Sequence, residues 1–142
     1  MIRDFMLKDI DDIMRLWLET NKQAHDFIES SYWDSNFTSV KEMLPQSTIY
    51  VYECDSQIQG FIGLIDDYIA GIFISKDNQS RGIGKKLLNY TKEKCDKLTL
   101  QVYQKNARAV QFYLREGFGI SKEQMDEESG EIEYFMEWRG LA

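Results

Sequence analysis

The feature that most constrains the fold of this 142-residue chain is the segment Gln79-Ser80-Arg81-Gly82-Ile83-Gly84. It follows a short apolar run, Ile69 to Ile74, and leads into Lys85-Lys86-Leu87-Leu88, where an amphipathic stretch begins. This order predicts a strand, a turn and a helix. The first N–H groups of a helix lack intrahelical partners and carry about half a positive charge, and glycines leave them open to an anion. The segment therefore indicates a site for the diphosphate of a nucleotide-derived cofactor.

Two common phosphate-binding loops do not match this segment. A Walker loop requires a glycine five residues before its Gly-Lys pair and a Ser or Thr after the lysine, and Gln79 and Lys86 occupy those positions. A dinucleotide fingerprint requires a third glycine three residues after the second, where this chain has Leu87. Both motifs are excluded, and the pattern Gln-x-x-Gly-x-Gly remains.

A second signal lies downstream, between Asn106 and Phe118. Asn106 is a favourable N-cap, Val110 and Leu114 recur at helical spacing, and Gly117 stands where a helix-ending glycine belongs. The segment therefore predicts one helix of about three turns, followed by a strand that starts near Phe118.

The glycine loop, together with a helix that has an Asn near its start and ends in Phe112-Tyr113-Leu114-Arg115-Glu116-Gly117-Phe118, resembles the GNAT superfamily of N-acetyltransferases, in particular its small bacterial members. The resemblance implies an α/β fold in which helices flank a mixed central sheet and the central parallel strands splay apart. It implies acetyl-CoA as the acetyl donor, no metal, and a primary amine of a small molecule, peptide or protein as the acceptor. It covers essentially the whole chain, so residues 1–142 are expected to form a single GNAT domain.

The resemblance also assigns residues to the coenzyme. Tyr113 is the expected general acid, because a phenol with a pKa near 10 is protonated at pH 7 and can donate to the departing thiolate. A purely structural role in the core is the alternative for this tyrosine. The expected cofactor-binding residues are Ile72, Phe73, Ile74, Gln79, Ser80, Arg81, Gly82, Ile83, Gly84, Lys85, Asn106 and Tyr113.

On the acceptor side, His25 and Tyr68 are the expected substrate-binding residues. A period of two places Tyr68 on the same strand face as Ile72 and Ile74. Members of the superfamily often have Glu or His near this position, whereas this chain has Tyr68. Deprotonation of the amine through water, or binding of an amine that is already neutral, is therefore expected. The alternative for His25 is a structural or solvated position.

The remaining pattern predicts the other elements of a mixed sheet flanked by helices. Asp9 is expected to cap the first helix, and Asp55-Ser56 to join a hairpin. Strands are expected over 2–5, 48–53, 58–65, 68–74, 98–102, 118–125 and 132–138, and helices from 10 onward and over 35–44, 81–95 and 106–117. A less regular segment that contains a short helical turn is expected over 21–32.

Composition narrows the function classes. Hydrophobic residues make up 43% of the chain and the net charge is −7, which argues against nucleic acid as a partner. No apolar run approaches membrane-spanning length, the first residues lack a signal-peptide core, and Cys54 and Cys95 are expected to be reduced thiols, so a cytoplasmic protein is expected. A homodimer is one expected assembly. A catalytically weak acyl-CoA sensor or partner-binding module, or an unrelated phosphate-binding enzyme such as a kinase, are the alternatives.

Overall fold

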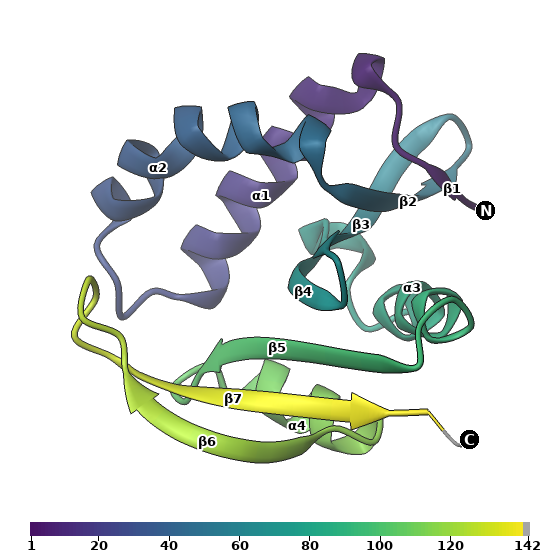
Figure 1. Cartoon of the computed structure of the whole chain (residues 1–142). Coiled ribbons are helices and arrows are strands. Elements are labelled where there is room, and N and C mark those ends of the chain that lie inside the picture. Colours follow the sequence, from purple (N-terminus) through teal and green to yellow (C-terminus); the bar gives the residue numbers. More distant parts are fainter. Residues whose placement is uncertain (141–142) are drawn as a thin grey trace.

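The computed structural model describes residues 1–140 and contains one mixed sheet with helices on both of its faces (Figure 1). Its seven strands lie in the order β1-β2-β3-β4-β5-β7-β6, and β4–β5 is the one parallel pair among them. Residues 141 and 142 of the predicted domain lie outside the described part. The elements are β1 (Ile2–Asp4), α1 (Ile10–Ala24), α2 (Ser30–Met43), β2 (Thr48–Cys54), β3 (Gln57–Ile65), β4 (Tyr68–Ile74), α3 (Ile83–Lys92), β5 (Lys97–Tyr103), α4 (Ala107–Arg115), β6 (Gly119–Met125) and β7 (Ile132–Arg139), with short 3-10 turns at Leu7–Asp9, Leu44–Gln46 and Lys76–Asn78.

The two parallel strands at the centre of the sheet diverge soon after they meet. The pairs between β4 and β5 are Tyr68 with Thr99 and Ile69 with Leu100, whereas β4 stays paired with β3 as far as Ile74. The second half of β4 therefore turns backbone groups towards open space instead of towards β5. The predicted mixed fold with splayed central parallel strands is confirmed.

Each face of the sheet carries its own hydrophobic core. On one face, α3 and α4 bury Leu87, Leu88 and Val110 against β3, β4, β5 and β7. On the other face, α1 and α2 bury Trp17 and Trp33 against β2 and β3. Full burial of a leucine is worth about 1.5–3 kcal/mol, so the amphipathic face of α3 fixes the position of the glycine loop that precedes it.

The helices before β2 differ from the prediction in two ways. The less regular segment is shorter than expected, because α1 continues to Ala24 and α2 already begins at Ser30, which leaves residues 25–29 between the two helices. Buried Asn21 remains in α1 because its Nδ2 donates to the carbonyl of Trp17 at 2.9 Å. Asp9 is the N-cap residue of α1, as predicted, but its side chain makes no capping bond: the carboxylate instead accepts from the guanidinium of Arg3 at 2.9 and 3.1 Å and from the N–H of Met6.

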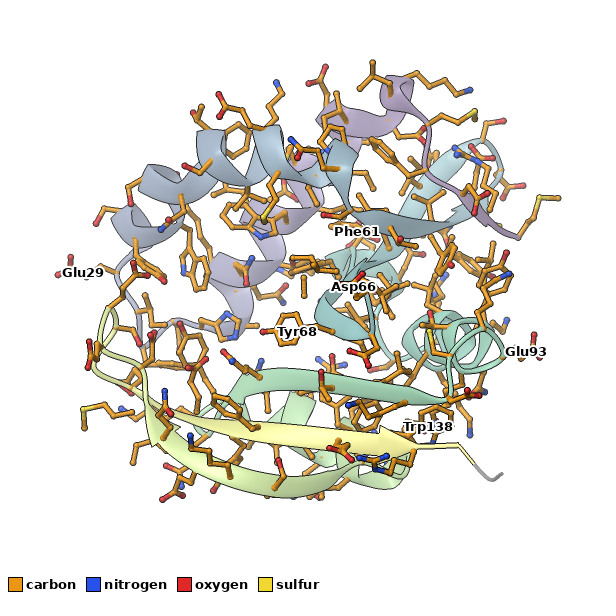
Figure 2. The ribbon with its side chains drawn as sticks, viewed as in Figure 1. Glu29, Phe61, Asp66, Tyr68, Glu93 and Trp138 are labelled. Carbon is orange, nitrogen blue, oxygen red and sulfur yellow. The ribbon has the colours of Figure 1, made fainter. Side chains whose placement is uncertain are left out.

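The face predicted for Tyr68 is also wrong, because β4 contains a bulge. Gly63 pairs with Gly71 and the next residue, Leu64, pairs with Ile69, so Ala70 is an extra residue that breaks the period of two. Ile69 thus joins Ile72 and Ile74 at the core under α3, and Tyr68 shares the opposite face with its partner Thr99. Figure 2 shows the Tyr68 ring near the centre of the molecule, between β4 and β5.

Candidate active site

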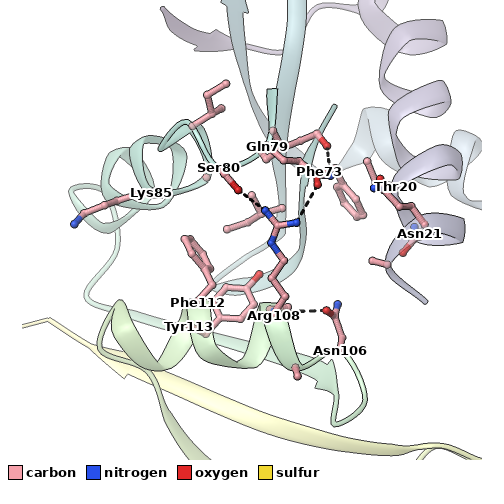
Figure 3. Close-up of a pocket in the computed structure, with 18 of the residues that line it drawn as sticks. Thr20, Asn21, Phe73, Gln79, Ser80, Lys85, Asn106, Arg108, Phe112 and Tyr113 are labelled. Carbon is pink, nitrogen blue, oxygen red and sulfur yellow. Dashed lines mark hydrogen bonds between the residues drawn. The ribbon is translucent and has the colours of Figure 1, made fainter. Parts of the chain in front are cut away.

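The divergence of β4 from β5 opens a cleft of about 920 Å³ bounded by β4, the first turns of α3 and α4, and the end of α1 (Figure 3). The structure brings most of the predicted site residues together around this space. Arg81 and Tyr68 are not among the lining residues, and the exposed guanidinium of Arg81 donates to Asn78. The predicted residues that line the cleft are His25, Ile72, Phe73, Ile74, Gln79, Ser80, Gly82, Ile83, Gly84, Lys85, Asn106 and Tyr113.

The glycine loop presents free backbone donors to the cleft. The N–H of Lys86 donates to the carbonyl of Gly82 at 3.1 Å and begins the helical pattern, so the preceding N–H groups of α3 have no helical partner. Gly82, the N-cap, has a φ of 80°, and Ser80 has a φ of 65°, a conformation that is strained for a residue with a side chain. A left-handed turn directly before a helix start is the backbone arrangement that binds anionic groups.

Arg108 on α4 reaches across the cleft to this loop, as Figure 3 shows. Its guanidinium donates to Oε1 of Gln79 at 3.2 Å and to Oγ of Ser80 at 2.6 Å. Gln79 is braced in turn, because its Nε2 donates to the carbonyl of Ile74 at the end of β4. Sequence reasoning missed Arg108. A cation in the first turn of a helix interacts unfavourably with the helix dipole, and this unusual position is the signal that could have marked Arg108 as a functional residue.

The charge around the cleft differs from that of the chain. The chain has a net charge of −7, but cationic side chains outnumber carboxylates along the lining. Such a surface attracts a polyanion such as a diphosphate into an otherwise acidic protein. The cationic lining residues are Lys85, Lys105, Arg108 and Arg115, and the acidic ones are Asp26 and Glu116.

Tyr113 lies at the floor of the cleft, where it packs edge-to-face on Phe112 and Phe118. Burial raises the pKa of its phenol, and the charge of Tyr68 raises it further. The phenol is therefore fully protonated at neutral pH. Tyr113 on α4 lines the cleft together with Ile72, Phe73 and Ile74 of β4, so a protonated phenol lies in the same cleft as the part of β4 that leaves β5.

Asn106 and His25 connect the two sides of the cleft. The Oδ1 of Asn106 accepts from the N–H of Ala109 at 3.3 Å, which confirms the predicted N-cap of α4. Its Nδ2 lies 3.1 Å from Nε2 of His25 and must donate, so Nε2 accepts and the ring is neutral with its proton on Nδ1. Burial lowers the pKa of His25 to about 4, in agreement with a neutral ring. Nδ1 of His25 and Nε1 of Trp33, whose rings stack at 5.3 Å, are both buried without a hydrogen-bond partner among the described residues.

The sheet face that carries Tyr68 continues beyond the cleft onto β5 and β7. Tyr103 packs edge-to-face on His25 and is the cross-strand partner of Glu133. Burial and the nearby charge of Asp126 raise the pKa of Glu133, and burial together with the charge of Glu133 raises the pKa of half-buried Tyr68. Sequence reasoning missed Glu133, because only the pairing of β7 with β5 brings this carboxylate to the sheet face of Tyr68.

Comparison with known families identifies the class of this fold and site. A family model described as "Acetyltransferase (GNAT) domain" matches residues 19–138, which include β4, the glycine loop and α4. The chain belongs to this family. The predictions of an acetyltransferase, of acetyl-CoA as the donor and of an amine as the acceptor are confirmed at the level of the family.

Individual relatives agree with this assignment. The chain is 32% identical to peptidyl-lysine N-acetyltransferase YiaC of Escherichia coli, over 97% of this chain and 96% of that protein. The solution structure of apo YjaB from Escherichia coli superposes with a TM-score of 0.86 at 23% identity, covering 99% of this chain and 98% of the other. An aminoglycoside 6'-N-acetyltransferase complexed with coenzyme A shares the fold, with a TM-score of 0.76 at 14% identity, covering 100% and 98% of the two chains.

Residues 1–140 contain neither a candidate membrane span nor a cluster of metal ligands. No helix within residues 1–140 combines the length and hydropathy needed to cross a bilayer. Among the same residues, no three His, Cys, Asp or Glu side chains gather as metal ligands would. Cys54 and Cys95 are both free thiols.

Proposed function

We propose that residues 1–142 form a single acetyltransferase domain that transfers the acetyl group of acetyl-CoA to the side-chain amine of lysine in a peptide or protein. The observation that carries this proposal is that three features meet at one cleft. They are the free N–H groups at the start of α3, the second half of β4, which is not paired with β5, and a protonated Tyr113. Each feature meets one requirement of acyl transfer from a coenzyme A thioester.

Backbone groups hold the coenzyme at its diphosphate and along its pantetheine arm. The N–H groups at the start of α3 receive the diphosphate, and Lys85 and Arg108 add charge-assisted hydrogen bonds to it. In Ile72, Phe73 and Ile74, the backbone groups that point away from β3 pair with the amides of the pantetheine arm, as an added strand would, except for the Ile74 carbonyl, which already accepts from Gln79. Asn106 lies beside the arm at the start of α4 and is held in place by His25.

Tyr113 supplies the proton that the leaving group needs. The amine nitrogen attacks the thioester carbon, the C–S bond breaks, and negative charge accumulates on sulfur. A buried phenol with a raised pKa keeps its proton in the ground state. It can therefore donate that proton when the thiolate develops beside it. The proton of the attacking amine leaves through water, because the predicted base position holds Tyr68 and not a carboxylate or imidazole.

The acceptor lysine approaches over the face formed by Tyr68, Tyr103 and Glu133. A lysine side chain has an apolar stem and a cationic tip, so aromatic rings and a carboxylate suit its two parts. The names of curated relatives support the choice of lysine, since both YiaC and YjaB are called peptidyl-lysine N-acetyltransferases. Substitution of Glu133 is therefore expected to affect the acceptor and not the coenzyme.

The experiment uses the full chain with acetyl-CoA and a lysine peptide whose N-terminus is blocked. Mass spectrometry should detect one acetyl group on lysine, and the same peptide with arginine in place of lysine should gain none. The rate should increase with pH above neutrality, because only the neutral amine attacks and a lysine amine has a pKa near 10.4. Coenzyme A binding without transfer to any amine in a panel would contradict the proposal and favour the weak sensor of the same fold.

We further propose a cytoplasmic location and assembly as a homodimer. Two free thiols support the location, because reducing compartments keep cysteines unpaired. The edge strand β6, whose residues are all exposed, is the candidate contact for a second copy. Light scattering coupled to size exclusion measures the assembly, and a mass of one chain at micromolar concentration would contradict the dimer.

A further inference from the structure

A second cavity, of about 160 Å³, lies behind the cleft between the sheet and helices α1 and α2. Its lining is almost entirely apolar, and Phe73 is the residue that borders both this cavity and the cleft. Figure 3 shows the Phe73 side chain on the side of β4 that faces α1. The lining residues are Trp17, Val40, Met43, Leu44, Ser47, Phe61, Gly63, Ala70 and Phe73.

The sheet presents small residues along this cavity. Gly63 on β3 pairs with Gly71 on β4, and a Cβ added to Gly63 would have no atom within 4 Å. Ala70, the extra residue of the bulge in β4, lines the same space with a single methyl group. Ala70 and Met43 are exposed, so the cavity is an apolar recess that opens to solvent at this end and has room for an apolar group.

The Phe73 ring forms the wall between the two spaces. It stacks on Phe61 with ring centroids 4.8 Å apart and an interplanar angle of 29°. It also lies over Gly71, since a Cβ at that position would overlap the Phe73 ring. The ring thus has a defined place, held by one aromatic neighbour and by the lack of a side chain on Gly71.

We propose that Phe73 sets the acyl-chain length that this enzyme transfers, by closing an apolar pocket that would otherwise receive the alkyl end of a longer acyl-CoA. The inference rests on the proposed function, because it places the thioester against the edge of β4 that β5 leaves unpaired at Ile72, Phe73 and Ile74. The alkyl end of a thioester held there meets the Phe73 ring. Acetyl fits in front of the ring, whereas butyryl needs the space behind it.

The chemistry of transfer is the same for both donors. The amine nitrogen forms the C–N bond, the C–S bond breaks with its electron pair on sulfur, Tyr113 protonates the thiolate, the amine loses its proton to water, and water returns a proton to the Tyr113 phenolate. Only the fit of the alkyl chain differs, and one methylene in an apolar pocket changes selectivity by about 10–200-fold.

The test is a competition between acetyl-CoA and butyryl-CoA for one lysine peptide, with both products counted by mass spectrometry. The wild type should favour acetyl, and Phe73→Ala should shift the product ratio towards butyryl by at least about tenfold. Phe73→Leu keeps more of the packing and should shift the ratio in the same direction by less. Gly63→Val, combined with Phe73→Ala, fills the cavity from β3 and should return the preference to acetyl, because valine is favoured in strands and the added Cβ has free space.

Calorimetry with coenzyme A itself separates the two proposals. Binding of coenzyme A by all variants, with an unchanged acetyl-to-butyryl ratio in both Phe73 variants, would overturn the role of Phe73 and leave the proposed function intact. A ratio that shifts but is not restored by Gly63→Val would also overturn the cavity as the place of the alkyl chain. Failure of the wild type to bind coenzyme A would overturn the proposed function, and this inference with it.

Discussion

The two sides of the cleft are built in different ways. The proposed cofactor side is formed mainly by one continuous stretch, from Ile72 through the glycine loop to Lys85, and it offers backbone N–H and C=O groups. The proposed acceptor side combines residues from distant elements, among them His25, Tyr68, Tyr103 and Glu133, and it offers side chains. A backbone site tolerates most side-chain changes, whereas a side-chain site depends on each residue. We therefore expect cofactor use to be robust to most substitutions and acceptor choice to be sensitive to single changes.

The largest effect is expected where the two sides meet, at Tyr113. Tyr113→Phe removes one hydroxyl from a buried site without changing its shape, so kcat should decrease by about 10²–10⁴ through loss of general acid catalysis. The dissociation constant for coenzyme A should stay within about twofold, because the backbone donors are untouched. A thiol-release assay gives kcat and calorimetry gives the affinity. Unchanged turnover in the variant would exclude Tyr113 as the acid.

The next prediction concerns the stability of the acceptor side at low pH. Folded His25 has a pKa of about 4, whereas an unfolded histidine has one near 6.5, so between these values the unfolded chain binds a proton that the folded chain does not. The free energy of unfolding should therefore decrease as pH falls from about 6.5 to about 4, and the contribution should be fully retained above that range. His25→Gln keeps an acceptor for Asn106 but does not titrate.

Urea unfolding at pH 7 and pH 5 measures this difference. The wild type should lose about 1–2 kcal/mol more than His25→Gln between the two pH values, allowing for partial exposure of the ring. His25 is the only histidine of the chain, so no second imidazole contributes. An equal loss in both proteins would assign the pH dependence to carboxylates instead.

A substitution of Glu133 should change the binding of the acceptor without changing the binding of coenzyme A. Glu133→Gln removes the charge proposed to receive the lysine ammonium, so KM for a lysine peptide should increase about tenfold while coenzyme A affinity is unchanged. Glu123→Gln is the matched control, because Glu123 is exposed on β6 and pairs with Tyr134, which lies on the opposite face of the sheet. A KM that stays the same in both variants would remove Glu133 from the acceptor site.

The same contrast explains how much the sequence predicts. Strand, turn and helix chemistry is local, so the strand, glycine loop and helix follow from residues 69 to 88, and the helix after Asn106 follows from its own residues. The splayed strands are expected from the family resemblance that these two motifs carry. Pairing between strands is not local. The bulge at Ala70 reverses the face of Tyr68, and the pairing of Tyr103 with Glu133 joins segments that no short motif connects. Arg108 is intermediate, since its position in α4 is predictable and its contact with Ser80 is not.

The smallest effect is expected at Gly82, and it tests the backbone nature of the cofactor side. Gly82 has a φ of 80° with no atom within 4 Å of an added Cβ, so Gly82→Ala is strained by its conformation and not by crowding. The free energy of unfolding should decrease by about 1–2 kcal/mol. Part of this strain should appear as a several-fold weaker affinity for coenzyme A, because the turn relaxes away from the geometry that directs the N–H groups of α3.

Gly130, in the turn between β6 and β7, is a suitable control because its backbone has the same left-handed conformation as that of Gly82. Its φ is 73° and an added Cβ again has no neighbour within 4 Å, but it lies away from the cleft lining. Gly130→Ala should therefore cost the same stability and leave coenzyme A affinity unchanged. If both variants weaken coenzyme A binding equally, the loss reflects global stability, and the left-handed turn at Gly82 has no special part in holding the diphosphate. If only Gly82→Ala weakens it, the turn itself contributes to binding, independently of any side chain in the loop.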